Sequence, residues 1–220
     1  MNYTELSSAI QAYTENTETN FVAEIPVFVQ QAEQRIYNSV QFPSIRKNVT
    51  GTTTINNKYL QCPTDFLATY SLAVIDAAGA YEYLLNKDVN FIRQAYPTPA
   101  DTGTPKYYAL FGPRSDNAAE LTFILGPTPD AAYSSELHYY FYPPSITVFP
   151  YTSWLGDNFD TVLLYASLVE AYTYMKGEPD MMALYNGKYQ EALALAKRLG
   201  DGLERGDAYR DGQTKIRVTT

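Results

Sequence analysis

The chain has one histidine, His138, and one cysteine, Cys62, and this limits the chemistry it could perform. One imidazole excludes HExxH and three-histidine metal sites, and one thiol excludes an internal disulfide and a CxxC zinc site. The sequence has no GxSxG segment, so a serine–histidine hydrolase is not indicated either. We therefore expect His138 to be a structural or interface residue and Cys62 to be a buried thiol.

Paired carboxylates are the remaining route to chemistry, because two of them can cleave a glycosidic bond. The candidates are Asp65, Asp76, Glu120, Glu136, Asp157 and Asp160. Most fall in predicted turns or helix starts, which explains them without catalysis. Gly200, Gly202 and Gly206 follow a predicted helix end rather than a strand, so they do not indicate a phosphate-binding loop. The sequence predicts no enzymatic activity, no metal site and no cofactor.

Composition limits the kinds of partner and leaves two explanations for the many tyrosines. The 220 residues have a net charge of −8, which argues against a broad nucleic-acid-binding face. Tyrosine accounts for 21 residues, and its amphipathic ring suits either a half-buried sheet face or a subunit contact. No signal peptide is evident, and the most apolar stretch, Val162 to Met175, is too short to span a bilayer. We expect a soluble protein that does not enter a membrane.

A pair of helices is predicted at each end of the chain. Asn2 and Glu5 have the spacing of a capping box at the start of the first helix. Pro26 is predicted in the first turn of the second helix. The third helix is expected to run to Lys176, and the fourth from Pro179 to about residue 199. Each pair has an apolar stripe that it cannot bury alone, so we expect the pairs to form a four-helix bundle.

The middle of the chain is predicted to be β structure. About seven short strands are bounded by Gly or Pro, and Asp88 can cap one short helix among them. Residues 50–55 and 59–62 are expected to pair as a hairpin, and residues 68–75 and 81–85 as a second one. The sequence thus predicts an α+β fold. Its parts are a helical bundle (1–45 plus 155–200), an antiparallel β module (46–154) and an extended C-terminal arm (201–220).

The C-terminal arm is predicted to bind a partner. It follows Gly200 and has no apolar stripe that the core of the protein could bury. Near its end two apolar residues alternate with two cations, a pattern that could add a strand to the sheet edge of another protein. The residues expected to make this contact are Arg205, Arg210, Lys215, Ile216, Arg217 and Val218.

Four segments carry a resemblance to a known family. They are Tyr3–Leu6 with Ala9, Ile10 and Tyr13; Ile25–Phe28 followed by Ala32–Ile36; Tyr59–Phe66; and Trp154–Leu155 with a following helix and Tyr185–Leu193. In this order they resemble the head-to-tail adaptor, or connector, of short-tailed bacteriophages. The resemblance covers nearly the whole chain and is stronger in the helices than in the β region.

The resemblance implies a structural virion protein without catalytic or cofactor residues. Adaptors of this family form a twelve-fold ring between the portal and the tail nozzle, and genome DNA passes through the channel without specific binding. The resemblance makes the portal the partner that we expect the C-terminal arm to bind, because of the arm's own residue pattern. It also implies that the protein resides in the host cytoplasm during assembly and then in the virion neck. We also expect an acidic channel surface, because the chain is acidic.

The alternative is a carbohydrate-binding or carbohydrate-cleaving tail protein. Such a protein needs exposed aromatic rings clustered on one face, often with tryptophan. This chain has a single tryptophan, Trp154, near the start of the third predicted helix.

Overall fold

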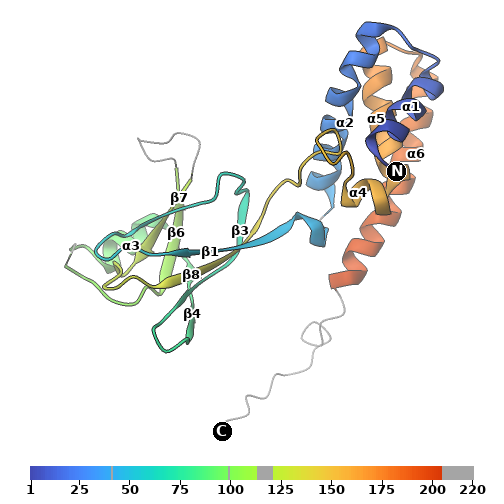
Figure 1. The fold of residues 1–220 in the computed structure, drawn as a ribbon. Helices are drawn as coiled ribbons and strands as arrows, with labels where there is room; N and C mark the ends of the chain where they lie inside the picture. Colours follow the sequence, from blue (N-terminus) through green and yellow to red (C-terminus); the bar gives the residue numbers. More distant parts are fainter. Residues whose placement is uncertain (41, 99, 113–120, 205–220) are drawn as a thin grey trace. The chain divides into compact units, whose positions relative to one another are not determined.

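The computed structural model describes residues 1–40, 42–98, 100–112 and 121–204, which form two compact units (Figure 1). The helical unit comprises residues 1–45 and 143–204, and the β unit comprises residues 46–142. Helices and antiparallel sheets are both present, so the predicted α+β class is confirmed. The helical unit includes residues 143–154, which the sequence pattern groups with the β module, because Ile146 is fully buried there.

The helical unit is organised around one central helix. It contains α1 (Tyr3–Thr14), α2 (Thr19–Ser39), a 3₁₀ turn η1 (Pro43–Ile45), α4 (Trp154–Asn158), α5 (Asp160–Met175) and α6 (Pro179–Glu204). Helices α1, α2 and α6 each pack against α5, so the two ends of the chain share one core. Four apolar residues of α5 are fully buried in that core: Leu163, Ala166, Leu168 and Ala171.

The start of α1 agrees with the prediction from the sequence, and the start of α2 does not. The capping box of α1 is confirmed: the Asn2 side chain accepts from the Glu5 N–H, and Glu5 accepts from the Asn2 N–H. The start of α2 was predicted wrongly, because the helix begins at Thr19 and Pro26 lies inside it. A proline inside a helix removes a backbone hydrogen bond. The burial of Phe21, with 1% of its surface exposed, stabilises the turns before the proline.

The end of α6 also differs from the prediction. The helix continues through Gly200 and Gly202 to Glu204, so residues 201–204 are helical and do not belong to an extended arm. A glycine costs a helix only about 1 kcal/mol relative to alanine, whereas a proline costs about 3 kcal/mol. Two glycines without a proline therefore do not end this helix.

The β unit is a sandwich of two four-stranded sheets. The first sheet has the order β1 (Arg46–Thr52), β8 (Ser134–Tyr140), β3 (Ala68–Ile75), β4 (Tyr81–Tyr83). The second has the order β2 (Tyr59–Gln61), β7 (Thr122–Gly126), β6 (Tyr107–Phe111), β5 (Leu85–Asn86). All pairs are antiparallel except β5 with β6. The core between the sheets takes buried side chains from both, including Leu72, Val74, Leu137, Tyr139, Tyr108, Phe123 and Leu125.

One of the two predicted hairpins is absent. This is the hairpin predicted between residues 50–55 and 59–62. β1 pairs with β8 and β2 pairs with β7, so the turn at Asn56 leads from the first sheet to the second. Asn56 has a φ of 59°, a left-handed conformation that asparagine tolerates. The second hairpin is confirmed, because β3 pairs with β4 through Ala73 and Tyr83.

A short helix, α3 (Val89–Ala95), covers the outer face of the second sheet. Its predicted cap is confirmed, because the Asp88 side chain accepts a hydrogen bond from the Asn90 N–H. Ile92 of α3 packs with Ala109 and Ile124 of the sheet. This small outer core positions the pocket described below.

Candidate interaction surfaces

The predicted partner-binding residues Arg205, Arg210, Lys215, Ile216, Arg217 and Val218 lie outside the described residues. Glu120 is outside them as well. The partner contact of the C-terminal arm therefore stays a prediction. The structure describes the other residues that were candidates for catalysis: His138, Cys62, Asp65, Asp76, Glu136, Asp157 and Asp160.

His138 and Cys62 occupy ordinary structural positions in the β unit. The His138 side chain is half exposed on β8, with Nδ1 3.4 Å from Ser71 Oγ and Nε2 3.8 Å from a Glu136 carboxylate oxygen. Cys62 is 4% exposed and belongs to the core between the sheets. Among the residues that the structure describes, no group of three His, Cys, Asp or Glu side chains could hold a metal ion.

Asp65 has a structural role that ties strands β1 and β8 to the loop after β2. Its carboxylate accepts hydrogen bonds from Lys47 Nζ and from Tyr139 Oη, each at 2.8 Å. Burial alone would raise the pKa of Asp65, but these hydrogen bonds, together with the positive charge of Lys47 and a backbone hydrogen bond, outweigh burial, and the pKa is lowered. Asp65 is therefore a charged anchor, and its lowered pKa does not suit a general acid.

Asp76 and Trp154 also have structural explanations. Asp76 closes the β3–β4 turn by accepting hydrogen bonds from the Ala78 and Ala80 N–H groups, both at 2.8 Å. The Trp154 ring is partly buried and packs 5.2 Å from Phe42 and 5.5 Å from Phe159, measured between ring centroids. Trp154 is thus part of the helical core and does not present a flat platform for a sugar.

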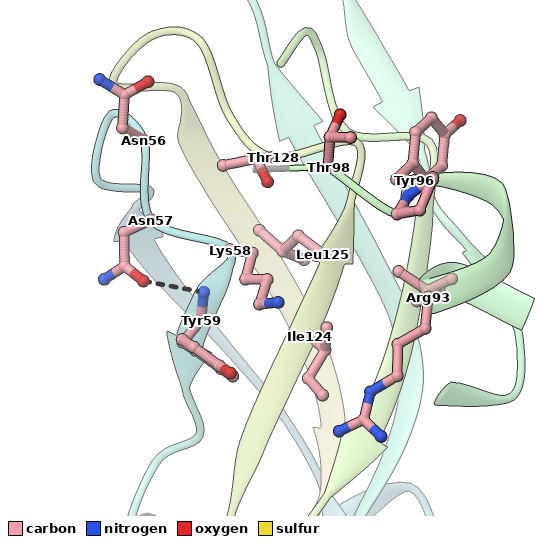
Figure 2. Close-up of a pocket in the computed structure, with 12 residues that line it drawn as sticks. Asn56, Asn57, Lys58, Tyr59, Arg93, Tyr96, Thr98, Ile124, Leu125 and Thr128 are labelled. Atoms are coloured by element: carbon pink, nitrogen blue, oxygen red, sulfur yellow. Dashed lines mark hydrogen bonds between the residues drawn. The ribbon is translucent and has the colours of Figure 1, made fainter. Parts of the chain in front are cut away.

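A pocket of about 240 Å³ lies beside α3, on the outer face of the second sheet (Figure 2). Lys58 and Arg93 stand on either side of Ile124, which lies on the floor of the pocket. Lys58 Nζ also lies 5.5 Å from the centroid of the Tyr59 ring. Among the described residues that line the pocket, none is acidic. Two cations over an apolar floor suit a carboxylate side chain of a partner protein. The sequence alone does not reveal this pair, because Lys58 and Arg93 are far apart in the chain.

A second cavity, which we call the side slot, opens between the edge strands β1 and β2 of the two sheets. Its volume is about 240 Å³, and its lining residues are Val49, Thr50, Gly51, Leu60, Gln61, Cys62, Pro63, Phe123, Ser135 and Leu137. Val49 pairs with the buried Leu137 but remains 37% exposed at this edge of the first sheet. Among the described lining residues, none carries a charge.

The helical unit presents an aromatic loop, residues 145–153. Phe149 lies near its tip and is 80% exposed, more than the other large apolar side chains of the described chain. Val148 and Tyr151 beside it are about half exposed. Sequence reasoning missed this loop, although Pro143, Pro144 and Pro150 around an aromatic residue are a signal for an ordered turn.

The acidic charge of the chain is concentrated in the helical unit. Residues 1–45 and 143–204 contain 13 Asp or Glu and 5 Lys or Arg, a net charge of −8. Residues 46–142 contain 9 Asp or Glu and 7 Lys or Arg, a net charge of −2. Ion pairs such as that between Arg35 of α2 and Glu170 of α5 use few of these acidic groups.

Many large aromatic and apolar side chains of the described chain are exposed, and Phe149 is the most exposed of them. The sequence matches the SU10 adaptor protein family over residues 1–215, so the chain belongs to this family. The family match confirms the resemblance to an adaptor. No helix in the described ranges has the length and hydropathy to cross a membrane.

No curated protein matches the chain. One solved structure with some similarity is described as "Neck of empty GTA particle computed with C6 symmetry". That chain is 10% identical, the TM-score is 0.26, and the comparison covers 78% of each chain. A similarity this low does not assign a fold or a function.

Proposed function

We propose that this protein is a structural head-to-tail adaptor of a phage-like virion, with no enzymatic activity. The observation that carries the proposal is membership of the SU10 adaptor protein family over residues 1–215. In this proposal the helical unit is a four-helix bundle built from the terminal helix pairs, and the β unit is the second module. Copies of the chain form a twelve-fold ring in the virion neck, after a period in the host cytoplasm during assembly.

Several separate contact surfaces support a role in assembly. A subunit of a cyclic ring needs two different surfaces for its neighbours, because its contacts are heterologous. An adaptor needs further surfaces for the portal above and the tail nozzle below. The chain offers the pocket that contains Lys58 and Arg93, the side slot and the aromatic loop, which lie on different elements.

The C-terminal arm is proposed to bind the portal. Residues 205–220 contain four basic and two acidic residues, so the arm is basic while the rest of the chain is acidic. Arg205, Arg210, Lys215 and Arg217 would face acidic residues of the portal, and Ile216 and Val218 would occupy apolar positions at a sheet edge. Many copies around a ring would raise the avidity of a contact that is weak in one copy.

Genome DNA is proposed to pass through the ring without specific binding. The net charge of −8 in the helical unit supports an acidic channel, because acidic groups do not anchor phosphates. In this proposal the channel continues from the portal into the nozzle.

Native mass spectrometry of the purified chain, alone and with portal, tests the proposal. We expect a homo-oligomer of defined size that binds the portal, or a monomer that assembles into such a ring once the portal is added. A chain that stays monomeric and does not bind the portal would contradict it.

A further inference from the structure

We propose that the pocket beside α3 of one copy binds a carboxylate side chain from the acidic helical unit of a neighbouring copy. This inference rests on the proposed function, because it assigns one contact between neighbouring subunits of the ring. Its two components are the cations of the pocket, Lys58 and Arg93, and a helical unit with a net charge of −8.

Lys58 and Arg93 have no acidic partner in the described chain. Its ion pairs between side chains involve other cations, such as Lys47, which binds Asp65. No acidic side chain is among the described residues that line the pocket. Two cations that face the same space repel each other, and an anion bound between them replaces this repulsion with attraction.

The residues that carry the two charges are held in place by the second sheet. The Lys58 carbonyl accepts from the Leu125 N–H at 2.8 Å, which ties Lys58 to β7. The Lys58 ammonium group lies 5.5 Å from the centroid of the Tyr59 ring. Arg93 belongs to α3, and the neighbouring Ile92 is buried against the sheet. Since the backbone of both residues is ordered before binding, less conformational freedom is lost when a partner binds.

The chemistry of the pocket suits a protein carboxylate better than a DNA phosphate. Lys58 and Arg93 stand on either side of the apolar Ile124, so an anion between them lies over a surface on which the CH₂ groups of Asp or Glu can pack (Figure 2). The guanidinium group can bind both oxygens of a carboxylate in parallel. Binding of duplex DNA needs many phosphate contacts, whereas two cations line this pocket and the β unit has a net charge of −2.

Charge complementarity favours the helical unit of a neighbouring copy as the source of the carboxylate. Two helical units, each with a net charge of −8, repel each other, and like charges across an interface reduce affinity. A β unit is nearly neutral, so it is the better partner for a helical unit, and contact between two different surfaces is what a ring requires. The exposed acidic residues of the helical unit include Glu15, Glu18, Asp157, Asp160, Glu178 and Asp180.

Carbodiimide cross-linking tests the contact, because it joins a lysine amine to a carboxylate only when the two groups touch. Rings assembled on portal-bearing heads from a mixture of isotopically labelled and unlabelled chains are cross-linked and digested. Mass spectrometry should find Lys58 linked to an acidic residue of the helical unit, in peptides that join a labelled to an unlabelled chain. Lys58→Arg keeps the charge without the reactive amine, so it should lose this link and still form rings.

Three results of the cross-linking would overturn the proposal. The first is the absence of any link at Lys58 in the assembled ring. The second is a link that forms only within one chain. The third is a link from Lys58 to a carboxylate of the portal, of the tail nozzle or of another β unit, because the partner would then not be the helical unit of a neighbour.

Neutralising substitutions give a second measurement. Lys58→Gln with Arg93→Gln should weaken association between copies by about tenfold or more. The control is Lys87→Gln with Lys106→Gln, which removes the same charge from exposed residues of the β unit that do not line the pocket. The control should change association less than about twofold. All four side chains belong to exposed residues, so both variants should keep the wild-type urea midpoint. Equal weakening by the two variants would overturn the proposal, because net charge alone would then explain it.

Other outcomes separate this inference from the proposed function. If the Lys58→Gln, Arg93→Gln chain forms normal rings but no longer binds the portal, this inference is overturned and the proposed function stands. If wild type binds duplex DNA at low salt and this variant does not, the pocket binds phosphates and the inference is overturned as well. If the wild-type chain forms no ring and binds no portal, both the inference and the proposed function have failed.

Discussion

Glu33 is a buried carboxylate on α2 that anchors the aromatic loop. Glu33 is 3% exposed, and its Oε1 accepts a hydrogen bond from the Ile146 N–H at 3.0 Å. Burial raises the pKa of Glu33, and hydrogen bonds from Ser145 and Ile146 only partly oppose this shift. The folded chain therefore holds the Glu33 proton more tightly than the unfolded chain does. The contribution of Glu33 to stability consequently falls as the pH rises through the interval between the unfolded and folded pKa values.

Replacing Glu33 by glutamine should remove this pH dependence while keeping an oxygen that accepts from Ile146. We expect the free energy of unfolding of Glu33→Gln, relative to wild type, to increase from pH 4.5 to pH 8. Urea unfolding of both proteins across this range measures the difference. Glu33→Ala is the control: it leaves the Ile146 N–H without its acceptor and should cost about 1–3 kcal/mol. A pH-independent difference for Glu33→Gln would show that Glu33 does not titrate in this way.

Two glycines of the helical unit should respond oppositely to alanine. A Cβ at Gly156 would lie 2.6 Å from the Met1 carbonyl oxygen and 2.7 Å from Ile146 Cδ1, so Gly156→Ala should cost about 1–3 kcal/mol of unfolding free energy. A Cβ at Gly187, inside α6, would meet nothing within 4 Å. Gly187→Ala should stabilise by about 0.5–1 kcal/mol. The midpoints of urea unfolding of the two variants, compared with wild type, measure these changes. A Gly156→Ala variant that is more stable than wild type would contradict the close packing at α4.

At the scale of elements, the C-terminal arm can be separated from the fold. Helix α6 ends at Glu204, so a chain truncated after that residue keeps every described helix and strand. We expect the truncated chain to have a wild-type circular dichroism spectrum and unfolding midpoint, yet to fail to join portal-bearing heads. Cryo-electron microscopy measures the fraction of heads that carry the truncated chain at the portal.

Two full-length variants separate charge from strand formation in the arm. Lys215→Glu with Arg217→Glu reverses the charges, and Ile216→Ser with Val218→Ser removes the apolar side chains. We expect both to reduce joining if the arm adds a strand to an acidic sheet edge. Normal joining by the chain truncated after Glu204 would refute a role for the arm.

At the scale of the whole molecule, the charge distribution predicts how the ring treats DNA. With −8 on the helical unit, the assembled ring should not retain double-stranded DNA in a mobility-shift assay at about 50 mM salt, where phosphate contacts are strong. A ring structure should show acidic residues facing the channel. A continuous basic lumen, or tight binding of DNA at low salt, would contradict this prediction.

The molecule should also be inactive towards polysaccharides and peptidoglycan. Asp65 and Asp76 already serve as hydrogen-bond acceptors within the β unit. We expect no release of reducing ends or muropeptides by the purified chain. Activity that is lost in an Asp65→Asn or Glu136→Gln variant would identify an enzyme instead.

The sequence by itself determined the features that depend on neighbours along the chain. The capping box at Asn2 and the cap at Asp88 were predictable because a cap acts within three residues. The α+β class followed from the periodicity of apolar residues within each segment. Family membership also required only the sequence.

Tertiary structure alone decided the features that depend on distant contacts. β1 is mostly exposed and pairs with β8, whose Leu137 and Tyr139 are buried in the core between the sheets, whereas β2 pairs with β7 in the other sheet. The nearest turn does not decide this pairing. The start of α2 before Pro26 depends on the burial of Phe21. The side slot and the exposure of Phe149 are likewise properties of packing. Local propensity has a range of a few residues, whereas burial joins residues that are any distance apart in the chain.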